Sequence, residues 1–78
     1  MPELRDVRPR DAIRALERAG GRVRSGAKGD HVNIKMPNGQ IVTLSGRREP
    51  IKIGLLKAAI RKAGLTEDEF VRLLEGGR

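Results

Sequence analysis

The chain has 78 residues and a formal net charge of +7, from 17 Lys and Arg against 10 Asp and Glu. This length predicts one domain over residues 1–78 with a thin core, which disfavours an enclosed cofactor pocket. The chain has no cysteine, which excludes disulfides and thiolate metal sites. So large a positive charge on so short a chain favours a polyanionic partner, most often a nucleic acid.

The sequence carries no recognisable targeting or membrane segment. The first six residues lack the apolar stretch of a signal peptide. No apolar run approaches the roughly 20 residues that a membrane-spanning helix needs. We therefore expect a soluble, cytoplasmic protein without a membrane partner.

The first expected element is a helix that begins at Pro9, because proline is favoured at the first helical position. Residues 1–8 before it are polar and are expected to be irregular. The apolar residues that follow recur at helical spacing and form one face: Ala12, Ile13, Leu16 and Ala19. Gly20 and Gly21 should end this helix, since glycine readily forms a left-handed C-terminal cap.

Three short strands joined by tight turns are expected next. The first covers residues 22–25 and leads into a glycine-rich turn over residues 26–30. In the second, over residues 31–36, apolar and polar residues alternate, which is typical of a strand with one buried face. Residues 37–39 (Pro-Asn-Gly) predict a hairpin turn, because Asn and Gly tolerate positive φ. The third strand then covers residues 40–44.

Two further helices complete the expected order. The first follows a basic loop over residues 45–50 and ends at Gly64. Its apolar residues recur at helical spacing: Ile53, Leu56, Ile60 and Ala63. Thr66 and Glu69 can satisfy each other's backbone donors as a capping box, so a last helix should run from Glu67 to Glu75.

This order predicts an α+β fold, helix–strand–strand–strand–helix with an extra C-terminal helix. A three-stranded antiparallel sheet would be covered by helices on one face, which is similar to the double-stranded-RNA-binding fold. Side chains alternate along a strand, so His31, Asn33 and Lys35 should share one face. We expect that face to be the open one.

Four segments of the chain, in this order and spacing, resemble the motifs of a known protein family. They are residues 16–20 (Leu-Glu-Arg-Ala-Gly), 28–31 (Lys-Gly-Asp-His), 36–39 (Met-Pro-Asn-Gly) and 53–66, which read Ile-Gly-Leu-Leu-Lys-Ala-Ala-Ile-Arg-Lys-Ala-Gly-Leu-Thr. Together they resemble the HicA (YcfA-like) toxin family, with its Gly-Ser-His motif, its Pro-Asp-Gly hairpin and its helix ending in Gln-Ala-Gly-Ile-Ser. The resemblance covers residues 9–75.

The resemblance implies a ribosome-independent endoribonuclease that cleaves messenger RNA (mRNA). It implies a HicB-like antitoxin as partner, which covers the active-site face. His31 matches the position of the family's catalytic histidine. The chain departs from the family at Asp30, where a serine is usual, and at Gly21 and Ile34, where aromatics are usual. No metal or cofactor is implied, and the open basic surface predicts a monomeric free toxin.

A single histidine suffices for this chemistry because RNA supplies its own nucleophile, the 2′-hydroxyl. An imidazole can transfer protons near neutral pH, and such catalysis contributes roughly 10²–10⁴-fold. Nearby cations can stabilise the charge that develops on phosphate oxygens. The expected RNA contacts are basic residues near His31, in the following loop and on the second long helix: Lys28, Lys35, Arg47, Arg48, Lys57 and Arg61.

Two other interpretations of the residues remain open. His31 is also consistent with an ordinary solvated strand histidine, in a module that binds RNA without cleaving it. The basic surface, which includes a stripe of Arg10, Arg14 and Arg18 on the first helix, is also consistent with an acidic protein partner alone. Phe70 is the one aromatic residue and is expected to be buried, so RNA recognition should use the backbone rather than base stacking.

Overall fold

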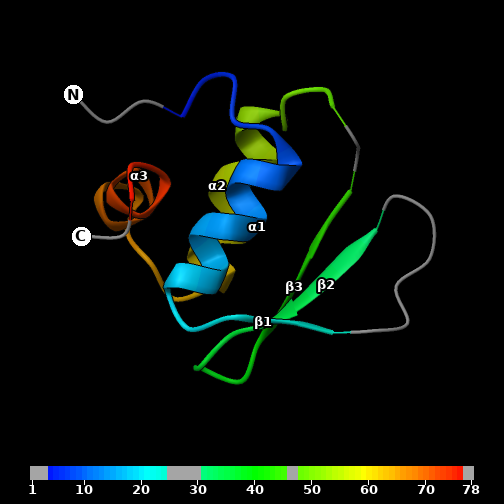
Figure 1. The fold of residues 1–78 in the computed structure, drawn as a ribbon, viewed down its shortest axis with the longest axis vertical. Helices are drawn as coiled ribbons and strands as arrows, with labels where there is room; N and C mark the ends of the chain where they lie inside the picture. Colours follow the sequence, from blue (N-terminus) through cyan, green and yellow to red (C-terminus); the bar gives the residue numbers. More distant parts are fainter. Residues whose placement is uncertain (1–3, 25–30, 46–47, 77–78) are drawn as a thin grey trace.

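Three helices and three strands follow one another in the order that the sequence predicts. The computed structural model describes residues 4–24, 31–45 and 48–76. The elements are α1 (Pro9–Arg18), β1 (Arg22–Arg24), β2 (Val32–Lys35), β3 (Ile41–Leu44), α2 (Ile53–Lys62) and α3 (Glu67–Leu74). The helices lie on one side of the sheet and leave its other face without a helix (Figure 1). The predicted α+β fold is therefore confirmed, with element ends that differ from the expected ones by a residue or two.

The sheet is an antiparallel meander in the order β1-β2-β3. Ile34 pairs with Val23 on one side and with Val42 on the other, which sets the register of all three strands. The predicted hairpin turn joins β2 to β3: the Gly39 N–H donates to the Met36 carbonyl (2.9 Å), and Gly39 has a φ of 89°. This positive φ is one that glycine adopts at little cost.

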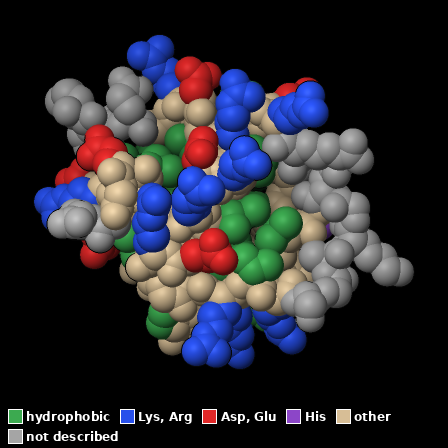
Figure 2. Space-filling view, in the orientation of Figure 1, with side chains coloured by type: hydrophobic (Ala, Val, Ile, Leu, Met, Phe, Trp, Pro, Cys, Tyr) green, Lys and Arg blue, Asp and Glu red, His purple; other side chains and the backbone are tan. Residues whose placement is uncertain are grey.

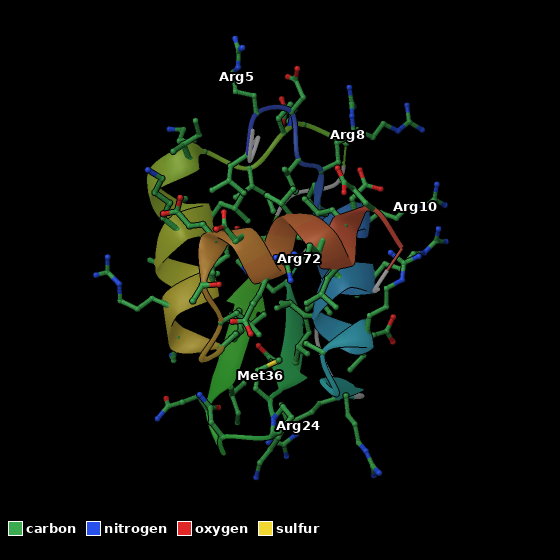
Figure 3. The ribbon with its side chains drawn as sticks, turned by 90° about the vertical axis from the view of Figure 1, so that its left-hand side faces the viewer. Arg5, Arg8, Arg10, Arg24, Met36 and Arg72 are labelled. Atoms are coloured by element: carbon green, nitrogen blue, oxygen red, sulfur yellow. The ribbon has the colours of Figure 1, made fainter. Side chains whose placement is uncertain are left out.

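The core lies between the sheet and the helices. The largest side chains with under 2% exposure come from all three helices and from two strands: Phe70, Leu16, Ile34, Leu56, Ile60 and Val42. Figure 3, viewed from the helix side, shows α3 crossing in front of α1 and α2 with the strands behind. The guanidinium of Arg18 donates to the Leu73 carbonyl (2.6 Å) and ties the end of α1 to α3. The last helix is therefore part of the core packing.

Gly21 sits where the chain leaves α1 and enters β1, and it is buried. Its N–H donates to the Leu16 carbonyl (2.9 Å), which closes the end of the helix. A Cβ at this position would lie 2.7 Å from Met36 Sδ and 2.8 Å from Ile34 Cγ2. The Leu16 carbonyl oxygen lies 2.8 Å from the same point and belongs to the backbone, so a side chain here would force the end of α1 or β1 to shift.

The predicted capping box at the start of α3 is confirmed. The Glu69 N–H donates to Thr66 Oγ1 (3.1 Å), and the Thr66 N–H donates to Glu69 Oε1 (2.8 Å). Two backbone donors that the helix cannot satisfy itself thus find acceptors.

Replacing Thr66 with alanine should lower the free energy of unfolding by about 0.5–2 kcal/mol, because the N-terminal donors of α3 lose their side-chain acceptor. Urea denaturation followed by circular dichroism measures the change. Thr66→Ser is the matched control, since it keeps the hydroxyl. A serine variant as unstable as the alanine variant would show that the hydrogen bond contributes little.

Candidate functional site

The open face of the sheet gathers polar and basic side chains from all three strands. Lys35 pairs with Arg22, and Asn33 pairs with Arg24 on one side and with Thr43 on the other. Directly paired residues of antiparallel strands present their side chains on the same face. Since Ile34, between Lys35 and Asn33, points into the core, these five side chains lie on the face without helices.

Asn33 and Thr43 are joined across two strands at the middle of this face. The Thr43 hydroxyl donates to Asn33 Oδ1 (2.7 Å). The amide oxygen is thereby engaged, so Asn33 keeps its Nδ2 donors for an acceptor on a bound molecule. A phosphate or base oxygen is an acceptor of this kind.

His31 precedes β2 directly and is exposed. The last pair of the β2–β3 ladder is Val32 with Leu44, so His31 lies one residue beyond it. Alternation of side chains along an extended strand predicts an imidazole on the side of Asn33 and Lys35. The side chain of His31 is exposed, so a large molecule can contact it without any movement of the core.

The other expected phosphate contacts are distributed unevenly. Lys35 lies on the open face, whereas Lys28 and Arg47 lie outside the described residues. Lys57 and Arg61 belong to α2, which packs on the covered side of the sheet and buries Leu56 and Ile60 there. Lys57 Nζ lies 3.9 Å from Glu67 Oε2 of α3. The structure thus brings Lys35 beside Asn33 and separates the α2 cations from them.

Arg48 belongs to a second basic cluster at the start of α1. With Arg8, Arg10 and Asp11 it lines a shallow hollow, and the guanidinium of Arg8 donates to the Arg48 carbonyl. Figure 3 shows Arg8 and Arg10 on the same side of the molecule, and Figure 2 shows further Lys and Arg side chains over α1. This surface belongs to the helix layer and is distinct from the open face of the sheet.

Arg22 and Arg24 were not among the phosphate contacts expected from the sequence. Both are exposed on β1, and the strand register sets them beside Lys35 and Asn33. The signal was present in the sequence as the alternation Arg-Val-Arg, which puts both arginines on one face of a strand. It did not say which face stays open, because that depends on where the helices pack.

The part of the chain that the structure describes contains neither a candidate metal site nor a membrane-spanning helix. No three His, Cys, Asp or Glu side chains there are grouped so that they could hold a metal ion. Within the same residues, no helix combines the length and the apolar character needed to cross a membrane. The groups gathered on the open face are the Asn33–Thr43 pair and three cations, and His31 directly precedes β2 beside them.

Comparison with models of protein families identifies the family of the chain. Residues 9–65 match the model of a family described as the HicA toxin of bacterial toxin–antitoxin systems. The matched segment includes α1, the three strands and α2, and it ends before α3. Neither the curated proteins nor the solved structures contain a match.

Proposed function

The chain belongs to the HicA toxin family, and we propose that it is an endoribonuclease that cleaves mRNA in the cytoplasm with His31 as its catalytic group and without a metal ion. One feature carries the proposal: the exposed His31 directly precedes β2, the strand whose Asn33 and Lys35 lie on the open face beside the two arginines of β1. Proton transfer and phosphate binding thus meet on one accessible surface.

The reaction needs no nucleophile from the protein. The 2′-hydroxyl of a ribose attacks the adjacent phosphorus, and the bond from phosphorus to the 5′ oxygen of the next nucleotide breaks. His31 accepts the proton of the 2′-hydroxyl while water protonates the departing 5′ oxygen, or His31 protonates that oxygen while water accepts the 2′-hydroxyl proton. Cations such as Lys35 and Arg24 stabilise the phosphorane oxygens. The products are a 2′,3′-cyclic phosphate and a 5′-hydroxyl.

Binding on this face relies on the RNA backbone. The only aromatic residue of the chain, Phe70, is 1% exposed and cannot stack on a base. Single-strand readers that select a sequence stack bases on exposed aromatic side chains. Arg22, Arg24 and Lys35 instead offer donors to phosphate oxygens, so cleavage should show little sequence preference.

The experiment that tests this function uses the purified chain with a long single-stranded RNA and with DNA of the same sequence, both in a chelator of divalent metals. We expect the RNA to be cut and the DNA to stay intact, because DNA lacks the 2′-hydroxyl. End analysis should find cyclic phosphates and 5′-hydroxyls. RNA that is bound and not cut would contradict the proposal and favour a non-catalytic RNA-binding module.

Removing both arginines of β1 should weaken RNA binding and its dependence on salt. On a single strand, each phosphate that the protein no longer neutralises lowers the slope of log K against log salt by about 0.7, so Arg22→Ala with Arg24→Ala should lower it by about 1.4. Fluorescence anisotropy at several salt concentrations measures both quantities. The control is the double variant Lys57→Ala with Arg61→Ala, which loses the same charge. It tests the RNA contacts predicted for α2. Equal effects of the two pairs would contradict a binding face centred on the sheet.

The partner of the toxin, in this proposal, is a HicB-like antitoxin that covers the open face. Such a partner would neutralise the toxin by keeping RNA from His31. The free toxin would be a monomer, because copies with a net charge of +7 repel one another.

A further inference from the structure

The free edge of β3 is a second surface that can bind a partner. β2 occupies one side of β3, and no described residue pairs with its other side. The Met36 N–H donates to the Gln40 carbonyl (2.8 Å), and hydrogen-bonded pairs alternate along an antiparallel ladder. The backbone groups of Val42 and Leu44 therefore face β2, and those of Ile41 and Thr43 face outward. An unpaired edge of this kind is a template for another strand.

An apolar groove of about 290 Å³ runs beside this edge, between β3 and α2. Its lining residues are Val42, Thr43, Leu44, Ser45, Ile51, Leu55, Ala58, Ala59 and Lys62. Leu55 is 63% exposed and is the most exposed large hydrophobic side chain among the described residues. An exposed apolar wall next to an unpaired strand is suited to an extended peptide, whose backbone pairs with the edge while alternate side chains enter the groove.

The charges around the groove select the kind of peptide. No acidic residue lines the groove, and the three charged residues of α2 are all basic: Lys57, Arg61 and Lys62. Lys62 lines the groove itself, and its carbonyl accepts a hydrogen bond from Asn38 Nδ2 (3.1 Å). A segment that alternates apolar and acidic side chains complements this surface. A second copy of the chain would bring the same positive charge to the contact, and RNA has neither aliphatic side chains for the groove nor a peptide backbone that could pair with the strand edge.

We infer that the edge of β3 and its groove bind an extended apolar and acidic segment of the antitoxin as a fourth strand of the sheet. The inference rests on membership of a toxin–antitoxin family and on this surface, and it does not depend on cleavage of RNA. The antitoxin then holds the toxin by an edge of the sheet as well as by the face that carries His31.

The test measures binding of a purified full-length HicB-like antitoxin to the chain by isothermal titration calorimetry without RNA. Leu55→Glu places a negative charge at the groove wall and should raise the Kd about tenfold or more. Ala58→Glu is a second variant of the same design. Ile53→Glu is the matched control: Ile53 is also exposed on the first turn of α2, undergoes the same change of charge and does not line the groove. We expect its Kd to stay close to that of the wild type.

Amide hydrogen exchange in the same complex locates the contact. We expect the outward-facing amides of Ile41 and Thr43 to become protected when the antitoxin binds. Protection confined to residues 22–24 and 31–35, with Leu55→Glu binding as tightly as the wild type, would overturn the inference. A dimer of the free chain that Leu55→Glu dissociates would also overturn it, because the groove would then belong to a second copy. Neither measurement involves RNA, so failure here and failure of the proposed cleavage are distinguishable.

Discussion

Replacing His31 with alanine should lower the rate of RNA cleavage by about 10²–10⁴-fold, which is the usual contribution of general acid–base catalysis. The loss falls on the chemical step, because the imidazole moves the proton and the cations beside it hold the phosphates. His31 is exposed, so thermal unfolding should be unchanged. Single-turnover cleavage at saturating protein separates the chemical step from binding.

Lys35→Ala is the matched control for this variant. It removes a side chain from the same face and the same strand, and it should weaken RNA binding more than it slows the bound complex. A His31→Ala protein that cuts RNA at the wild-type rate would remove the histidine from the mechanism. If His31→Ala cleaves slowly and also binds RNA as weakly as Lys35→Ala does, His31 acts in binding instead.

Replacing Phe70 with alanine should destabilise the protein by about 3–5 kcal/mol, the range seen when a buried phenylalanine is truncated. Phe70 is 1% exposed and is the largest of the fully buried side chains. A chain of 78 residues has roughly 4–12 kcal/mol of stability in total, at 0.05–0.15 kcal/mol per residue. The substitution should therefore remove much of it, and part of the population should be unfolded at room temperature.

Thermal unfolding followed by circular dichroism measures this effect. Each kcal/mol lowers the Tm of a domain this small by about 4–8 °C, so the expected fall is at least about 12 °C. Leu55→Ala is the control, because Leu55 is 63% exposed and its truncation leaves no cavity. A Phe70 variant that melts like this control would mean that α3 contributes little to the core.

The elements that could be predicted from the sequence depend on neighbours close along the chain. The capping box joins Thr66 to Glu69, and the hairpin turn closes over residues 36–40. Alternation over residues 31–36 identified one strand and put His31 on its polar face. Interactions of this kind span two to four residues, so they form in much the same way whatever the rest of the chain does.

The composition of the site could not be predicted in the same way. The sequence shows that Arg22 and Arg24 alternate with an apolar residue. It does not show that they lie beside Lys35 and Asn33, because strand register joins residues that are 9 to 13 positions apart. Lys57 and Arg61 were grouped with the phosphate contacts on charge alone. The packing of Leu56 and Ile60 against the sheet then placed that helix on the covered side.

By itself the sequence determined the order of the elements, the α+β class and the likeness to the HicA family, which the match over residues 9–65 then established. Only the tertiary structure decided that Arg22 and Arg24 lie beside Lys35 and Asn33 and that a side chain at Gly21 would crowd the Leu16 carbonyl. It also decided that β3 ends the sheet with a free edge beside an apolar groove. The physical reason is that local hydrogen bonding and periodicity specify each element and its two faces, whereas contacts between distant residues decide which face is covered and which edge stays unpaired.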